Sequence, residues 1–195
     1  MEWLALVLFV SVTVALLRGG RLINLADIRL RAWWLLILGF GLQVASNFLP
    51  EDASWASSVG VGLVLASFVP LLILVFLNRD KPGMWLAAIG ILMNFTVIAL
   101  NGGMPVLTEA AQVASGSEGD VILDDYKHVV MDADTWLPTL GDVIPLRLLG
   151  VGTVISLGDV FLAVGLGVFL ESELRRPIRW FKKGARSRSG SAAGG

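Results

Sequence analysis

Five long apolar stretches constrain the fold of this chain more than any other feature. Four have clear bounds, at residues 3–17, 32–49, 57–77 and 84–100, and a fifth ends near Leu170. Each is close to the roughly 17 to 25 residues that a helix needs to cross a bilayer. A mean hydropathy of +0.76, with 55% hydrophobic and 16% charged residues, is also far from an ordinary soluble domain. We therefore expect an all-α integral membrane protein with five transmembrane helices.

The basic residues are distributed asymmetrically along the chain. Four follow the first stretch, two follow the third and seven follow the fifth, so thirteen of the fifteen Lys and Arg residues share one side; the exceptions are Lys127 and Arg147. The positive-inside rule then predicts an outside N-terminus and a cytoplasmic C-terminus. We expect one transmembrane domain over 1–183 and a disordered cytoplasmic tail over 184–195. The lipid bilayer is the expected partner, with anionic inner-leaflet lipids bound by the basic C-terminal segment.

Absent residues and motifs exclude several classes of function. The chain contains no cysteine, which excludes disulfides, thiolate metal sites and cysteine nucleophiles. It also has no glycine-rich phosphate loop, haem motif or nucleic-acid signature. We therefore expect no cofactor and no nucleic-acid partner.

The segment from about 101 to 155 is the least lipid-like part of the chain. It holds eight acidic residues and the only histidine, His128. In its second half, apolar residues alternate with turn formers such as Pro138, Gly141 and Pro145, a pattern typical of short extended pieces. We expect a partly re-entrant extracytoplasmic cap between the fourth and fifth helices.

Asp159 lies in the stretch VISLGDVFLAVGLGVFL, where a carboxylate at bilayer depth would cost roughly 2.5 to 3.5 kcal/mol. Ser156 and Asp159 have the S-x-x-D spacing of a capping box, which would start the helix at Leu157 near the membrane surface. Alternatively, Asp159 could act with Asp142, because LGDVIP at 140–145 and LGDVFL at 157–162 place both residues at similar turns. Close carboxylates can share a proton and activate water.

Two resemblances to known families accompany these motifs. Through RGGRLINLADIRLR, NGGMPV and HVVMDADTWLPTLGDVIP followed by SLGDV, the chain resembles an uncharacterised bacterial family of polytopic membrane proteins, domain of unknown function 5317. This resemblance implies a multi-pass protein of the bacterial cytoplasmic membrane.

The C-terminal third is similar, more locally, to the lipoprotein signal peptidase, an intramembrane aspartyl peptidase. GDVI at Asp142 and GDVFLAVG at Asp159 resemble its two catalytic segments, and Asn101, Gly102 and Gly103 resemble its Asn-x-Gly motif. Its G-N-x-x-D-R motif is absent here. The resemblance implies catalysis by Asp142 and Asp159, with Asn101–Gly103 binding or orienting the substrate.

Other polar residues allow further interpretations. His128, Asp132 and Asp134 have ligand types that could hold a divalent metal, or they could belong to a solvated loop, which we favour. Asn94 and Asn101 lie seven residues apart on one helical face, where they could line a cavity or form hydrogen bonds between helices. We favour the hydrogen bonds.

Three functions remain open from the sequence. The first is an aspartate-dependent hydrolase acting at the outer leaflet on a lipid-linked or lipopeptide substrate. The second is a non-catalytic subunit or assembly factor with a membrane-protein partner. The third is a small transporter, which the absence of ionisable residues inside the other apolar stretches disfavours.

Overall fold

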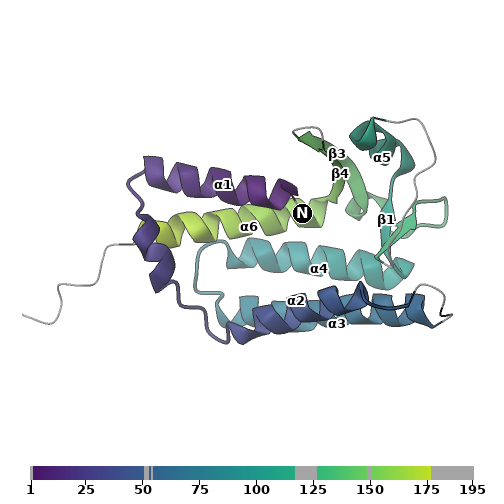
Figure 1. Cartoon of the computed structure of the whole chain (residues 1–195), viewed down its shortest axis with the longest axis horizontal. Helices are drawn as coiled ribbons and strands as arrows, with labels where there is room; N and C mark the ends of the chain where they lie inside the picture. Colours follow the sequence, from purple (N-terminus) through teal and green to yellow (C-terminus); the bar gives the residue numbers. More distant parts are fainter. Residues whose placement is uncertain (1, 51–52, 54, 117–126, 149–150, 177–195) are drawn as a thin grey trace, which may run out of the picture.

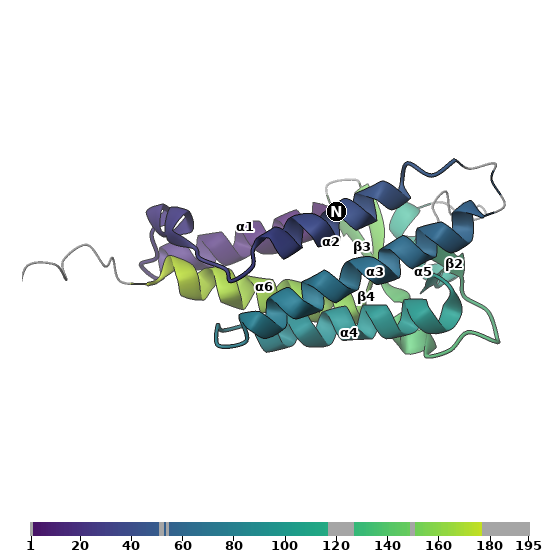
Figure 2. The same cartoon turned by 90° about the horizontal axis from the view of Figure 1, so that it is seen from below.

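Five α-helices lie roughly along a common axis (Figures 1 and 2). The computed structural model describes residues 2–50, 53, 55–116, 127–148 and 151–176; the expected disordered tail and the basic segment beyond Arg176 lie outside them. The helices are α1 (Glu2–Leu17), α2 (Trp34–Ser46), α3 (Ala56–Leu77), α4 (Met84–Asn101) and α6 (Leu157–Leu174). They pack in a row in the order α1, α6, α4, α3 and α2. The C-terminal helix α6 therefore lies between the first helix and α4.

A four-stranded mixed sheet covers one end of the helical row. Its strands, in the order β2-β1-β3-β4, are β1 (Met104–Val106), β2 (His128–Val130), β3 (Asp142–Leu148) and β4 (Val151–Ser156). Strand β1 is parallel to β2 and β3, whereas β3 and β4 are antiparallel. The short helices α5 (Thr108–Ser115) and η2 (Pro138–Leu140) complete this end. The expected all-α fold is therefore wrong, because the segment interpreted as a re-entrant cap pairs its extended pieces into a sheet.

The expectation of five transmembrane helices is also wrong. Among the described residues, only α3 and α4 are long and apolar enough to cross a membrane, judged by length and composition. Helices α1 and α2 have 16 and 13 residues, and the 18 residues of α6 include three acidic side chains. Apolar stretches in the sequence therefore overestimated helix length, since the stretch at 32–49 continues past both ends of α2.

Helices α4 and α6 approach each other closely through glycine. A side chain at Gly90 would collide with the backbone of Gly158 and Leu162, and one at Gly165 would collide with the backbone of Ala87 and Gly83. On its other side α4 packs against α3, where the rings of Phe68 and Phe95 meet edge to face with centroids 6.2 Å apart. The α4–α6 contact thus fixes the two helices that lead into and out of the sheet.

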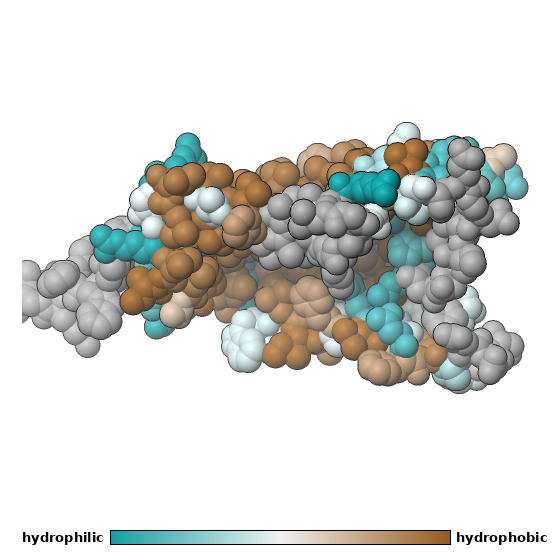
Figure 3. Space-filling model, turned by 45° about the horizontal axis from the view of Figure 1, so that its top comes forward, coloured by the Kyte–Doolittle hydropathy of each residue, from teal (hydrophilic) through white to brown (hydrophobic). Residues whose placement is uncertain are grey.

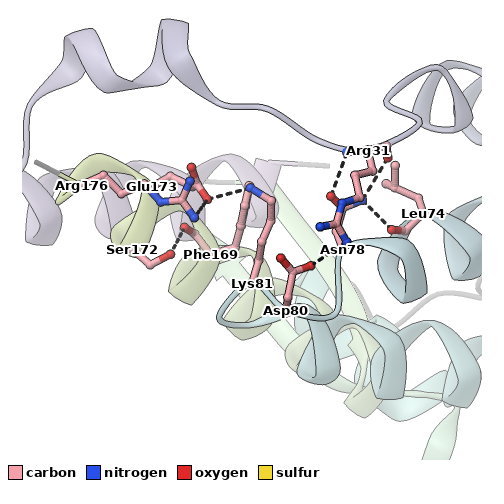
Figure 4. Close-up of polar contacts among 9 residues, drawn as sticks. All are labelled: Arg31, Leu74, Asn78, Asp80, Lys81, Phe169, Ser172, Glu173 and Arg176. Carbon is pink, nitrogen blue, oxygen red and sulfur yellow. Dashed lines mark hydrogen bonds and ion pairs between the residues drawn. The ribbon is translucent and has the colours of Figure 1, made fainter. Parts of the chain in front are cut away.

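A polar network closes the opposite end of the row, which we call the basic end. The buried carboxylate of Glu173 accepts from Lys81 Nζ at 3.0 Å and pairs with Arg176 Nη2 at 2.8 Å (Figure 4). Asn78 exchanges two hydrogen bonds with the backbone of Arg31, at 2.9 and 3.0 Å. These contacts tie the α3–α4 turn to the end of α6 and to the segment before α2.

Glu171 forms a second ion-pair group at the basic end. Its carboxylate lies 3.0 Å from the guanidinium groups of both Arg175 and Arg18. The hydrogen bond from Arg175 is the main cause that lowers the pKa of Glu171 below its ordinary value, and Arg18 contributes in the same direction. The pair with Arg18 connects the end of α1 to α6.

Candidate functional site at the sheet end

Helix α6 begins at a capping box, as the sequence predicted. Ser156 is the N-cap; its hydroxyl accepts from the backbone N–H of Asp159 at 3.0 Å, and Asp159 Oδ2 accepts from the backbone N–H of Ser156 at 3.2 Å. These reciprocal bonds satisfy two N–H groups that a helix start leaves open, and the carboxylate also lies at the favourable end of the helix dipole. Asp159 therefore has a structural role at the start of α6.

Asn94 of α4 joins the cap from the neighbouring helix. Its Nδ2 donates to Asp159 Oδ1 at 2.8 Å, and its Oδ1 accepts from the Ser156 hydroxyl at 3.0 Å. Gly158 makes this approach possible, because a Cβ there would lie 1.9 Å from Asn94 Oδ1. Both carboxylate oxygens of Asp159 thus accept hydrogen bonds inside the Asn94–Ser156–Asp159 group. The predicted hydrogen bonding between helices is confirmed for Asn94.

Asp142 lies on the other side of Ser156. It is the first residue of β3, and its Cα pairs with that of Ser156 across the β3–β4 ladder. The fold thus brings Asp142 beside Ser156, the N-cap that Asp159 bonds, although Asp142 and Asp159 are seventeen residues apart in sequence. Their side chains have different contacts, because Oδ2 of Asp142 lies 3.5 Å from Nε2 of His128.

The His128–Asp142 pair combines a buried acid with a more accessible imidazole. The side chain of Asp142 is 7% exposed, whereas that of His128, on strand β2, is 33% exposed. A carboxylate beside an imidazole can fix the orientation of the ring. An imidazole and a carboxylate in such contact can act as a general base and its orienting acid.

The expected substrate-orienting residues Asn101, Gly102 and Gly103 have structural contacts. The side-chain amide of Asn101 donates to the carbonyl of Trp136 at 3.0 Å and accepts from its backbone N–H at 2.8 Å. Gly102 ends α4 with a φ of +68°, a conformation that favours glycine. A Cβ at Gly103 would lie 2.7 Å from a methyl group of Val129. This motif joins α4 to the sheet and holds the loop that carries Trp136.

The candidate metal residues do not form one cluster. Oδ1 of Asp132 accepts from the backbone N–H of Asp134 at 3.0 Å and from the hydroxyl of Thr135 at 2.9 Å, which makes a local turn. His128 instead contacts Asp142. No group of three or more His, Asp or Glu side chains suited to a metal ion occurs within the ranges that the structure describes.

The sequence interpretation missed two contacts at this site. It did not connect His128 with Asp142, because β2 and β3 come together only through parallel pairing with β1. It also did not connect Asn101 with Trp136, which lies 35 residues away. One feature of the sequence could have indicated the first contact: the only histidine of the chain lies in a segment rich in acidic residues.

Comparisons with known proteins identify a family whose function is unknown. A model of a family of unknown function, DUF5317, matches residues 27–171. The chain is also 36% identical over 110 residues to an uncharacterized protein of Thermotoga maritima, a match that covers 55% of this chain and 61% of that relative. No solved structure matches the chain.

Proposed function

Because the chain belongs to DUF5317, a family of unknown function, we propose its activity from the site itself. We propose a multi-pass protein of the bacterial cytoplasmic membrane that hydrolyses a lipid-linked or lipopeptide substrate at its sheet end. Asp142 and His128 are the reacting pair. The Asn94–Ser156–Asp159 group fixes the start of α6, next to Asp142. The 3.5 Å contact between His128 and buried Asp142 carries this proposal.

Exposed tryptophans support the membrane location. Trp55 and Trp136 lie at the sheet end, whereas Trp33, Trp34 and Trp85 lie at the basic end, and all five are more than half exposed. Tryptophan is enriched at both interfaces of a membrane. Between these two sets α3 has 22 residues, or about 33 Å at roughly 1.5 Å per residue, which matches a hydrocarbon core of about 30 Å.

Apolar side chains cover the surface between the tryptophans. Large examples on α2, α3 and α4 are Ile37, Phe40, Val69, Ile73, Ile89 and Leu92, each at least 40% exposed. On the face drawn in Figure 3, hydrophobic residues (brown) run along the helical body and hydrophilic residues lie mainly toward the ends. We therefore assign α3 and α4 as a membrane-crossing hairpin, with the basic end in the cytoplasm.

The chemistry follows from the positions of the two side chains. One ring nitrogen of His128 accepts a proton from a water molecule. The water oxygen attacks the carbonyl or phosphoryl centre of the substrate at the same time. The carboxylate of Asp142 stabilises the imidazolium that forms. The same proton then passes to the leaving oxygen or nitrogen as its bond to the centre breaks, which returns the imidazole to its neutral form.

A substrate panel with matched variants tests this proposal. Wild type reconstituted in vesicles is incubated with phosphoester, carboxylic ester and lipopeptide substrates, and product is followed by mass spectrometry. His128→Gln and Asp142→Asn should each lower turnover by at least about 100-fold, the usual contribution of general acid–base catalysis. Asp134→Asn, an exposed acid of the same end, is the control and should retain activity. Equal turnover in all four proteins would refute the assignment.

A second function has its own support in the structure. Asp159, Asn101 and Asp132 are all engaged in hydrogen bonds within the protein, which suits a non-catalytic subunit or assembly factor. Helices α1 and α2 also pack mainly on one neighbour each and leave apolar faces for a membrane partner. Purification from native membranes distinguishes the two functions, because a stoichiometric partner together with inactivity on the panel would favour the subunit.

A further inference from the structure

A short helix at the basic end has its polar residue inside and its apolar residues outside. Helix η1 (Leu22–Asp27) follows α1 and is the dark blue helix at the left of Figure 1. Nδ2 of Asn24 donates to the carbonyls of Leu174 at 2.7 Å and Arg176 at 2.8 Å, and Asn24 is only 7% exposed. These bonds attach η1 firmly to the end of α6.

The orientation of Asn24 turns the apolar side chains of η1 outward. Leu22, Ile23 and Leu25 are 54%, 66% and 39% exposed. A short amphipathic segment in water would bury such residues and expose its asparagine. The reversed pattern favours an apolar environment outside the protein, next to this end of the helical row.

The charge around η1 indicates what that environment contains. Most acidic side chains of the basic end already have basic partners, as the Glu173 and Asp80 contacts in Figure 4 show. Three exposed arginines form no ion pair with any residue that the structure describes: Arg21, Arg29 and Arg79. Within the described part of this end, Asp27 is the only further exposed acid. An excess of positive charge therefore surrounds the apolar residues.

We propose that η1 is an interfacial anchor for anionic phospholipids of the cytoplasmic leaflet. Leu22, Ile23 and Leu25 enter the boundary between headgroups and acyl chains, and Arg21 and Arg29 bind the phosphates. This inference rests on the membrane location proposed above and is independent of the hydrolase. Arginine suits the role because its planar guanidinium can bind a phosphate through two hydrogen bonds.

Site-directed spin labelling tests the anchor directly, because the chain contains no native cysteine. Ile23→Cys and, as a water-exposed reference at the other end, Asp134→Cys are each labelled in the full chain. Both are reconstituted in phosphatidylcholine vesicles with or without about one third phosphatidylglycerol. Flotation first shows whether the protein enters the vesicles. Label accessibility is then measured with oxygen, which partitions into lipid, and with a water-soluble nickel complex.

We expect the oxygen-to-nickel accessibility ratio at residue 23 to exceed that at residue 134 several-fold in anionic vesicles. Adding Arg21→Gln and Arg29→Gln should lower the ratio toward its value in neutral vesicles, whereas Lys127→Gln with Arg147→Gln should leave it unchanged. A floating protein with equal ratios at both labelled sites would overturn the anchor alone. An equal effect of the two charge pairs would overturn the role of the arginines. A protein that does not float would overturn the membrane location as well.

Discussion

Asn94→Ala should destabilise the protein strongly, because Asn94 is the only side chain of α4 that bonds both partners of the α6 cap among the described contacts. The variant loses a hydrogen bond to the Asp159 carboxylate at 2.8 Å and one from the Ser156 hydroxyl at 3.0 Å. A bond to a charged group contributes about 1.5–3 kcal/mol and a neutral one about 0.5–1.5 kcal/mol. We therefore expect the free energy of unfolding to fall by about 2–4 kcal/mol.

The measurement is reversible unfolding in a mild detergent, followed by circular dichroism, with Thr96→Ala as the control. Thr96 lies on the same helix but is exposed, and its hydroxyl donates only to Leu92 of its own helix. Asp159→Asn and the double variant with Asn94→Ala complete a cycle, whose coupling energy should be about 0.5–3 kcal/mol. If Asn94→Ala costs no more than Thr96→Ala, or the coupling is near zero, the proposed role of the group is wrong.

Other variants test separate contacts. Gly158→Ala should lower the free energy of unfolding by more than about 2 kcal/mol, because its Cβ would collide with an amide oxygen 1.9 Å away, whereas Gly41→Ala, with open space around it, should be neutral or stabilising. Asn101→Ala should speed hydrogen exchange and proteolysis around Trp136 while helical circular dichroism stays unchanged, because two bonds to that backbone are lost. Because the pKa of Glu171 is lowered, its ion pairs stabilise the fold above the ordinary pKa of 4.5 and lose this effect as pH falls through the folded-state pKa. Glu171→Gln should therefore flatten the dependence of the melting temperature on pH in that acidic range. An unchanged pH profile of the melting temperature would contradict the contribution of these ion pairs.

The start of α6 could be predicted from sequence because a capping box depends on residues three positions apart. Ser156 and Asp159 supply all of its donors and acceptors locally, so no knowledge of the rest of the fold is needed. Asn94 was identified as a residue for contacts between helices, but its partners were not. They depend on the axial register of α4 against α6, which Gly90 and Gly158 set through close backbone contact.

The sheet could not be predicted to the same extent. Extended pieces between the fourth and fifth apolar stretches were expected, yet their pairing joins residues such as Met104 and His128 that are far apart in sequence. A parallel pair of strands lacks the local turn signal of a hairpin, so pattern alone did not reveal it. For this reason His128 was interpreted as a loop residue or metal ligand, and its contact with Asp142 was missed. Catalysis by Asp142 and Asp159 together stays a prediction.

The position of α6 between α1 and α4 also has a consequence for synthesis on the ribosome. Helix α1 is translated before α6, but α1 packs mainly on α6, and the carbonyl that accepts the Arg21 and Asn24 hydrogen bonds belongs to Leu174. Helix α1 must therefore wait for about 150 further residues before it meets α6, whereas α3 and α4 can pair as soon as they leave the ribosomal tunnel. During that interval the surface of α1 that packs on α6 has no partner helix, so the row of helices can close only after α6 has been synthesised.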